Sequence, residues 1–284
     1  MAVRYCNYRS FVETRFLWFS NGSTKLSSIR CSPNIDLIMT INLGSRNRQS
    51  ELMDDPLLNG NTHRQALASL RRINWLSRSD RTVWKEILKQ AKANSCERPL
   101  TILDIAAGGG DLAIRLASLA ERDGVSVAID GCDISPTALD FATDQATATH
   151  RDNVRFFQCD ALLQPFPRPE YDVVMCSLFL HHLKEADAIL LMQRMKAAAT
   201  QLILVDDLRR TRLGYWLAWL GCRILTRCHV VHVDGPMSVE GAFTSSEALG
   251  IAAKAGLPHA ALQHHWPQRF TMSWRPNNRD VNAG

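Results

Sequence analysis

The chain has 284 residues, which is enough for one large α/β domain with helical additions and a sizeable core. Its formal net charge of +5 and its isoelectric point near 8.8 would suit an acidic substrate or an anionic membrane surface. This excess of positive charge is too small to indicate nucleic-acid binding, and the sequence has no basic arm, zinc-finger or helix-turn-helix signature.

Residues 1–38 differ in composition from the rest of the chain. They are rich in serine and carry five basic side chains against two acidic ones. Their one apolar cluster, Phe16–Phe19, is too short for a signal peptide. We expect this segment to be disordered or untranslated, with Met39 as the true start, although its composition also allows an organelle transit peptide.

A helical cap is expected over residues 39–98, because apolar residues recur there at helical spacing in two successive stretches. The first stretch has Leu67, Leu70, Ile73 and Leu76, and the second has Val83, Trp84, Ile87 and Leu88. The candidate N-caps are Asn61 or Thr62 for the first helix and Ser79 or Asp80 for the second.

The stretch from Thr101 to Leu116 predicts a strand, a glycine turn and a helix opened by Asp111. This order is typical of a nucleotide site, since glycines let the backbone approach a ligand and a helix N-terminus offers unpaired N–H groups. Asp104 is the next-to-last residue of this strand, Thr101–Ile105, and lies just before the turn. A carboxylate at that place would repel a pyrophosphate and would suit a ligand with a positively charged end.

Two ligand classes compete for this turn. Gly108–Ala113 fits the dinucleotide fingerprint G-x-G-x-x-G/A, which favours a nicotinamide or flavin enzyme. Asp104 and Asp111 favour S-adenosylmethionine (SAM), because they place carboxylates where SAM carries its ammonium and sulfonium. The sequence LDIAAGGGDLA also resembles the first motif of class I SAM-dependent methyltransferases, D/E-x-G-x-G-x-G, with alanine in place of the first glycine. The resemblance assigns to the cofactor site Asp104, Ala106, Gly108 and Gly110.

The next two strands are each predicted to end near an acidic residue. Asp133 lies about 20 residues beyond the glycines, where a carboxylate can accept both ribose hydroxyls, and Ile134 after it would pack on the adenine. The pattern D-I-S-x-x-A-L that begins at Asp133 resembles the second motif of the family. In that family an acid after the third strand accepts from the adenine amino group and the next residue supplies a backbone N–H. Asp160 and Ala161 match these two positions.

Tyr171–Leu183 is predicted to be the fourth strand and its exit. The reacting methyl group is expected to pass residues Cys176 to Leu178, and Cys176 is assigned to the cofactor site. His181 and His182 are candidates for acid–base chemistry, although H-H-L here resembles methyltransferases of differing chemistry and commonly begins the next helix. No further ligands occur at suitable spacing, so no metal site is predicted.

The fifth strand is predicted at Gln201–Asp207. The carboxyl ends of parallel strands form the ligand crevice of such sheets, so Asp206 and Asp207 would border the substrate.

An insertion, residues 208–242, follows the fifth strand. Leu213–Cys222 is uncharged and flanked by arginines, but it is too short to span a membrane. One face of the helix would carry Leu213, Trp216, Leu217, Leu220 and Ile224. Residues 213–227 therefore predict a helix on a membrane interface, a lid over a lipophilic substrate, or equally an additional core helix or dimer contact.

Phe243–Leu257 resembles the helix that precedes the last two strands in quinone-biosynthesis-like methyltransferases. The strands themselves are predicted at Ala260–His265 and Arg269–Arg275, and residues 277–284 form a polar tail. Weak candidates for contact with the substrate are His232, His264 and His265.

The eight cysteines include no C-x-x-C pair. Cys132, Cys159 and Cys176 fall within or near predicted core strands. This placement favours buried free thiols in a reducing compartment over a disulfide framework.

The resemblance covers roughly Thr101 to Arg275 and is closest to the ubiquinone/menaquinone-biosynthesis and polyketide-associated small-molecule methyltransferases. It implies an α/β, Rossmann-like fold over residues 99–276: a seven-stranded, mostly parallel sheet of order 3-2-1-4-5-7-6 whose last strand is antiparallel. The helical cap would precede this sheet, and the helical insertion would follow its fifth strand.

The implied activity is in-line transfer of a methyl group from SAM to a phenolic or quinol-like, lipophilic small molecule, by O- or C-methylation. The hypothetical bases are His182, His232 and Asp207. The alternatives are a methyltransferase-like binding subunit without catalysis and an NAD-dependent oxidoreductase. We expect a cytoplasmic protein, with peripheral membrane contact through residues 213–227 as an option. The sequence does not indicate an oligomeric state.

Overall fold

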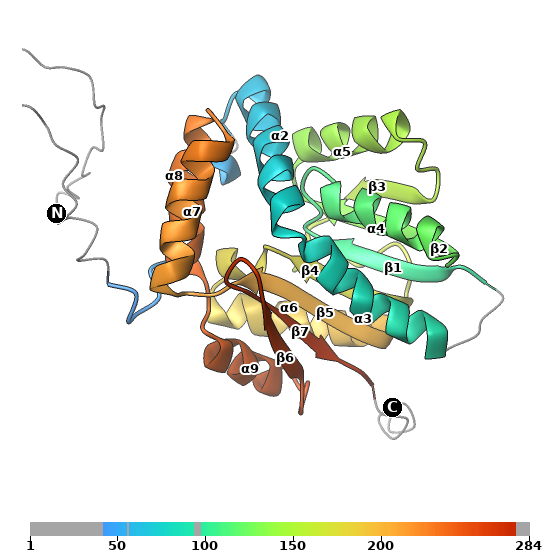
Figure 1. Cartoon of the computed structure of the whole chain (residues 1–284). Helices are drawn as coiled ribbons and strands as arrows, with labels where there is room; N and C mark the ends of the chain where they lie inside the picture. Colours follow the sequence, from blue (N-terminus) through green and yellow to red (C-terminus); the bar gives the residue numbers. More distant parts are fainter. Residues whose placement is uncertain (1–41, 56, 94–97, 277–284) are drawn as a thin grey trace, which may run out of the picture. The chain divides into compact units, whose positions relative to one another are not determined.

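The computed structural model of the chain describes residues 42–55, 57–93 and 98–276. Within them lies a seven-stranded sheet of order β3-β2-β1-β4-β5-β7-β6 (Figure 1). The neighbours β3, β2, β1, β4 and β5 are parallel, while β7 is antiparallel to both β5 and β6. The predicted fold class is thereby confirmed. The expectations for residues 1–38 and 277–284 lie outside the described residues. The strands are β1 (Leu100–Ile105), β2 (Val127–Asp133), β3 (Val154–Gln158), β4 (Tyr171–Ser177), β5 (Ala199–Leu208), β6 (Ala261–His265) and β7 (Arg269–Trp274).

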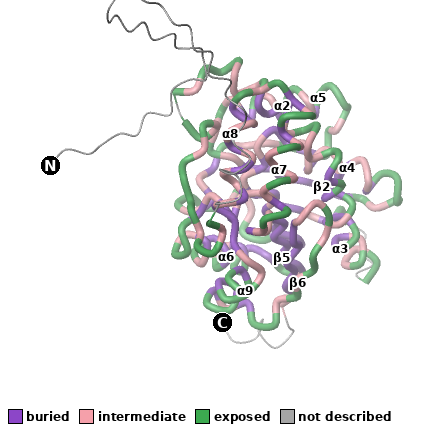
Figure 2. The backbone as a smooth tube through the Cα atoms, turned by 60° about the vertical axis from the view of Figure 1, so that its left-hand side comes forward, coloured by how far each residue is buried: buried purple, intermediate pink, exposed green. Residues whose placement is uncertain are grey.

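Helices cover both faces of the sheet, and the two sides have separate cores. One core joins α3 and α4 to strands β1, β2, β4 and β5, and the other joins α6 and α9 to the opposite face. Figure 2 shows the buried residues concentrated along the strands and on the inner sides of the helices. The helices are α2 (Gly60–Ser77), α3 (Ser79–Ala93), α4 (Asp111–Arg122), α5 (Pro136–Ala148), α6 (Glu185–Ala198), α7 (Arg212–Leu225), α8 (His229–Gly241) and α9 (Ser245–Lys254), with the 3₁₀ turns η1 (Leu52–Asp54) and η2 (Leu180–His182).

The central strands are apolar along nearly their whole length because both of their faces are covered. All residues of β4 except Ser177 are buried, and so are all residues of β1 except Thr101. A sheet covered on both sides can bind a ligand only at the ends of its strands, which places the site at the carboxyl edge of the parallel strands.

A cap of three helices, α2, α7 and α8, lies beyond this carboxyl edge (Figure 1). Ala66 of α2, Cys222 of α7, and Val230 and Val231 of α8 form its own small core. Residues 229–241 lie within the predicted helical insertion, but no individual helix was located there from the sequence. A proline such as Pro236 disfavours a helix, because it lacks an N–H group. The structure shows a helix running through Pro236, so packing in the cap outweighs the local preference.

Two smaller predictions can be compared with the structure: the N-cap of the first cap helix and the state of the core cysteines. The N-cap of α2 is Asn59, which accepts from the N–H groups of Asn61 and Thr62, so the predicted cap was two or three residues late. Cys132, Cys159 and Cys176 are buried free thiols, as predicted. In the described part of the chain, no helix has the length and hydropathy that crossing a membrane would require.

Candidate active site

One large cavity, of about 1060 Å³, lies over the carboxyl ends of β1, β2, β3, β4 and β5 and under the cap. Its floor is polar and contains the glycine turn and the acids at the strand ends. Its upper wall is apolar. That wall includes Leu67, Leu70 and Ile73 of α2, Leu217, Leu220 and Ile224 of α7, and Val231 of α8.

The glycine turn joins β1 to α4 through three residues with positive φ angles: Ala106 (φ +55°), Gly108 (φ +53°) and Gly110 (φ +73°). A Cβ on Gly108 would meet no atom within 4 Å, so the backbone there faces open space in the cavity. Gly110 differs, because a Cβ on it would lie 2.5 Å from the ring of Phe156, and it does not line the cavity. Ala106 accepts a left-handed conformation that costs an alanine about 1–2 kcal/mol.

Three carboxylates surround this turn, and the most buried of them is unpaired. Asp104 is 2% exposed, and its Oδ2 has no hydrogen-bond partner among the described residues. Burial, with the charges of Asp111 and Asp133, raises its pKa well above the usual range. The pKa of Asp111 is also raised, mainly by burial, although Asn74 donates to its carboxylate. A buried, unpaired carboxylate at the cavity floor fits the ammonium of SAM and does not fit a phosphate.

Asp133 is fixed at the edge of the same turn. Its Oδ2 accepts the Gly108 N–H at 2.8 Å, and its Oδ1 accepts the Ser135 N–H at 2.9 Å. Because a carboxylate has about four acceptor positions, two remain for ribose hydroxyls. Ile134, which is 65% exposed, lies next to it in the cavity wall.

Asp160 and Ala161 line the cavity at the end of β3. The Asp160 carboxylate accepts the Leu162 N–H at 2.9 Å, so it is turned back onto its own loop. The Asp160 N–H donates to Gln164, and Arg194 binds the Ala161 carbonyl, so the loop is held from two sides.

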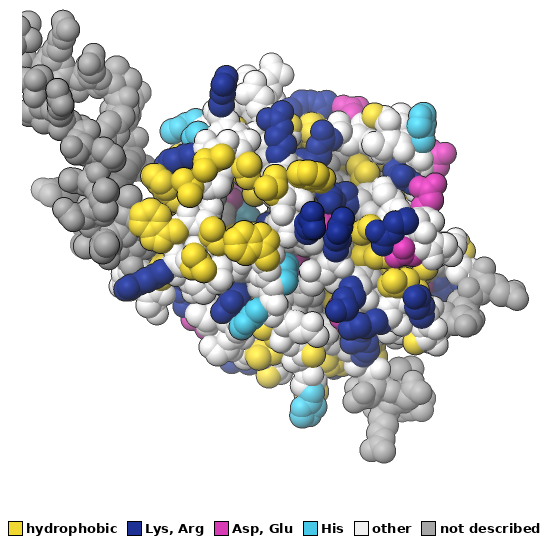
Figure 3. All heavy atoms as spheres, viewed as in Figure 1, with side chains coloured by type: hydrophobic (Ala, Val, Ile, Leu, Met, Phe, Trp, Pro, Cys, Tyr) yellow, Lys and Arg dark blue, Asp and Glu magenta, His cyan; other side chains and the backbone are white. Residues whose placement is uncertain are grey.

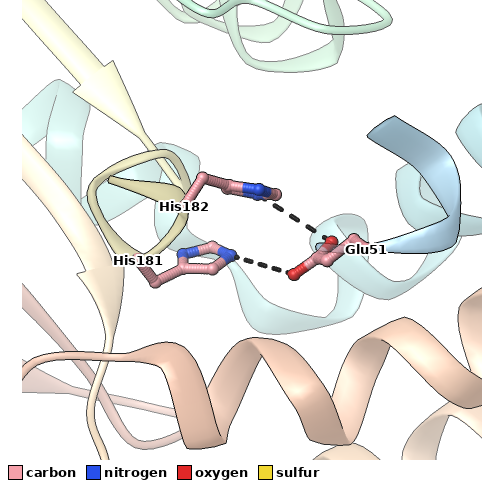
Figure 4. Close-up of side chains that lie close together, drawn as sticks. All are labelled: Glu51, His181 and His182. Carbon is pink, nitrogen blue, oxygen red and sulfur yellow. Dashed lines mark ion pairs between the residues drawn. The ribbon is translucent and has the colours of Figure 1, made fainter. Parts of the chain in front are cut away.

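Two histidines at the end of β4 converge on one carboxylate (Figure 4). His181 Nε2 lies 3.6 Å from Glu51 Oε1, and His182 Nε2 lies 3.9 Å from Glu51 Oε2. Each histidine has a second acidic partner on its other ring nitrogen. Nδ1 of His181 lies 2.6 Å from Asp207 Oδ1, and Nδ1 of His182 lies 2.9 Å from Asp54 Oδ2. Burial lowers the pKa of His181, but Asp207 and Glu51 outweigh it and raise the pKa to about 10.

The known proteins to which this chain is similar are methyltransferases, in agreement with a cavity that suits SAM. The family model for the methyltransferase domain matches residues 102–201. Residues 102–201 are thus similar to a methyltransferase domain. The demethylmenaquinone methyltransferase of Deinococcus radiodurans is 39% identical over 79 residues, which is 28% of this chain and 31% of that protein. The 2-phytyl-1,4-naphtoquinone methyltransferase of Nostoc punctiforme is 28% identical over 113 residues, which is 39% of this chain and 47% of that protein.

These matches span less than half the length of either curated relative. Solved structures share the fold of the methyltransferase domain at low identity. An O-methyltransferase of Planctomyces limnophilus in complex with apigenin has a TM-score of 0.57 at 16% identity, covering 78% of this chain and 63% of that one. Human N-acetylserotonin methyltransferase in complex with SAM has a TM-score of 0.56 at 18% identity, covering 77% of this chain and 57% of that one.

The structure places most of the residues predicted for the cofactor on the cavity of the methyltransferase domain. The cavity is lined by Asp104, Ala106, Gly108, Asp133, Ile134, Asp160 and Ala161. Two predicted residues do not line it. Gly110 is required for packing against Phe156, and Cys176 is buried within β4, so Ser177 and Leu178 reach the cavity in its place.

Of the hypothetical bases His182, His232 and Asp207, His182 lines the cavity, as does the other acid–base candidate, His181. The structure does not bring His232 there, because its Nε2 contacts the Thr226 carbonyl within the cap. Asp207 is buried and contacts Nδ1 of His181. Asp206 faces away, accepting from His265 and Thr271. His264, 2.8 Å from the Ser245 hydroxyl, does not line the cavity either.

Glu51 and Asp54 were not predicted from the sequence as site residues. The acidic turn around them was visible, but its contact with His181 and His182 spans about 130 positions and depends on the cap.

Proposed function

We propose that this chain transfers a methyl group from SAM to a small, lipophilic acceptor bound under the cap. One observation carries the proposal: the buried, unpaired Asp104 carboxylate beside the open face of Gly108. When bound, SAM supplies a methyl group on a positively charged sulfur that is its own leaving group. The chain must therefore bind and orient both molecules and keep water from the reacting atoms.

Residues on the polar floor of the cavity would bind SAM, and residues of the apolar upper wall would bind the acceptor. Asp104 would hold the ammonium, Asp133 the ribose hydroxyls, and Ile134 and the Asp160–Ala161 loop the adenine. The apolar wall of α2, α7 and α8 would bind the acceptor and exclude water. A ring hydroxyl of the acceptor would face His182 and Glu51, the polar groups on the same side of the cavity.

Calorimetry with SAM and NAD tests the cofactor assignment. We expect SAM to bind and NAD to show no heat, with Asp104→Asn weakening SAM binding at least about 10-fold, since a charged hydrogen bond contributes about 1.5–3 kcal/mol. The control is Asp140→Asn at an exposed carboxylate of α5. NAD binding without SAM binding would overturn the proposal in favour of an oxidoreductase.

A phenolic or quinol-like acceptor is supported by the apolar upper wall and by the quinone methyltransferases among the relatives. Incubation of the chain with labelled SAM and a set of naphthoquinols and phenols, followed by mass spectrometry, identifies the acceptor and distinguishes O- from C-methylation. SAM binding with no transfer to any acceptor in cell extract would instead favour a non-catalytic binding subunit.

Contact with a membrane surface is supported by the outer face of α7. Leu213, Trp216, Leu220 and Ile224 are all exposed there, and Figure 3 shows hydrophobic side chains gathered over α7 and α8 with Lys and Arg side chains nearby. Leu220 and Ile224 also line the cavity, so a lipophilic acceptor could enter along this face.

Sedimentation with vesicles tests this contact. We expect the chain to bind vesicles containing anionic lipid, and Trp216→Ser with Ile224→Ser to reduce binding severalfold. Equal sedimentation of wild type and variant would remove membrane contact through residues 213–227 from the proposal.

A further inference from the structure

Glu51, His181 and His182 form a cluster that the methyl-transfer proposal leaves only partly explained. We infer that this His₂Glu cluster binds one divalent first-row transition-metal ion, of the Zn²⁺ type, at the acceptor side of the cavity. The metal-binding inference rests on these side chains, while the role given to the ion rests on the proposed function.

The distances support ligation better than hydrogen bonding. The two Nε2–carboxylate separations, 3.6 and 3.9 Å, exceed the 2.7–3.2 Å or so of an N–H···O hydrogen bond. The ligand atoms of all three residues lie within 4.8 Å of one another. Atoms bonded at about 2.0–2.2 Å to one tetrahedral ion lie roughly 3.4 Å apart, so small side-chain rotations would complete the set.

The second ring nitrogens provide independent support. In metal sites the ligating histidine usually donates its other N–H to a carboxylate, which fixes the ring and makes the ligand more basic. Both histidines show this arrangement, His181 with Asp207 and His182 with Asp54. Both Nε2 atoms are thereby aimed at Glu51 (Figure 4).

The charges also favour a cation. Three carboxylates, those of Glu51, Asp54 and Asp207, surround two imidazoles. They outnumber the one positive charge that the raised pKa of His181 implies, and a metal ion bound at Nε2 would displace that proton. The one hydroxyl recorded on Glu51, from Ser238, donates only a neutral hydrogen bond. A divalent ion would offset most of this negative charge. Two nitrogen ligands favour a transition metal over Mg²⁺ or Ca²⁺, which prefer oxygen.

The surrounding chain holds the three ligands in place. Asp234 of α8 accepts the N–H groups of Leu52 and Met53, directly after Glu51. Arg46 and Arg48 donate to the carbonyls of His181 and His182. The site therefore joins the segment before η1 to η2, and all three ligands line the cavity.

Three protein ligands leave a fourth position for water or for the acceptor hydroxyl. Bound there, the hydroxyl would lose its proton to solvent. Its oxygen would then form the new bond to the methyl carbon as the carbon–sulfur bond breaks and its electron pair stays on sulfur, leaving S-adenosylhomocysteine.

Metal binding is measured on the full chain without an affinity tag. After treatment with EDTA, the protein is titrated with Co²⁺, followed by visible absorption, and with Zn²⁺, followed by equilibrium dialysis and elemental analysis. We expect one ion per chain, and at least 10-fold weaker binding in Glu51→Gln and His182→Gln. His264→Gln, at a histidine outside the cluster, should match wild type. Asp54→Asn should weaken binding about 10–100-fold through the second ring nitrogen.

The inference is overturned if wild type binds neither ion, or if Glu51→Gln and His182→Gln bind as wild type does. Calorimetry with SAM on the same EDTA-treated samples reports folding and separates the two proposals. SAM binding without metal binding removes only the metal site, whereas metal binding without SAM binding removes the proposed cofactor.

Discussion

At the scale of single residues, two glycines of one turn have different tasks. Both have positive φ, but Gly108 faces the cavity and Gly110 packs against Phe156. We expect Gly108→Ala to fold with a loss of about 1–2 kcal/mol from backbone strain, while its new Cβ weakens SAM binding at least about 10-fold. Gly110→Ala should fail to fold or unfold at much lower denaturant, because the ring and the Ala142 methyl must move. Urea titration and calorimetry separate the two effects, and equal behaviour of the two variants would contradict this division.

The raised pKa of Asp104 should make both stability and SAM affinity depend on pH. Because its pKa is raised, the carboxyl is protonated at low pH, and its ionisation destabilises the free protein as pH rises through that pKa. SAM requires the ionised form, so its affinity should increase with pH over the same range, with proton release. Asp104→Asn should remove this dependence and make the free protein more stable than wild type at higher pH. Calorimetry in buffers of different ionisation enthalpy measures the protons released. A flat affinity in wild type would show that Asp104 does not bind the ammonium.

At the scale of elements, Asp172 joins β4 to β1 at the edge opposite the site. Arg98 and the Thr101 N–H donate to its buried carboxylate at 2.6–2.8 Å. Burial raises the pKa of Asp172, but these donors outweigh it and lower the pKa below its usual value. The stabilisation is therefore present above the unfolded-state pKa and lost as pH falls through the folded one. Asp172→Asn should lower the free energy of unfolding by about 1–3 kcal/mol at pH 7, with the difference from wild type shrinking in acid.

Chemical denaturation across pH measures this difference, with Asp152→Asn at an exposed position as the control. A loss that is the same at acidic and neutral pH would assign the effect to packing and not to the charge of Asp172.

At the scale of the whole molecule, the sequence predicts the sheet far better than the cap. Asp104, Asp133 and Asp160 could be located because each lies at or near the carboxyl end of its own strand, and parallel strand ends meet at one edge whatever the rest of the chain does. The His181–Glu51 pair could not, because it forms only after residues 42–55 have packed against α8 and η2. The bounds of the helix through Pro236, inside the predicted helical insertion, could not be located for the same reason, since tertiary packing decides them.

Arg210 ties these distant parts of the molecule together. Its buried guanidinium donates to the Leu43 carbonyl, to the Ala242 carbonyl after α8, and to both oxygens of Glu247 at the start of α9. Glu247 is partly exposed, so solvent can satisfy it once Arg210 is removed, but the two carbonyls would lose their donor. We expect Arg210→Met to lower the free energy of unfolding by roughly 2–3 kcal/mol.

The exposed Arg72→Met, by comparison, should change the unfolding free energy by under about 0.5 kcal/mol. Because Arg210 lies outside the cavity lining while its partners border the cap, SAM affinity should be kept and acceptor affinity reduced in Arg210→Met. Urea unfolding and separate titrations of the two ligands measure this. Equal losses of affinity for SAM and for the acceptor would contradict this expectation. They would mean that the change at residues 42–55 affects the SAM side of the cavity as much as the acceptor side.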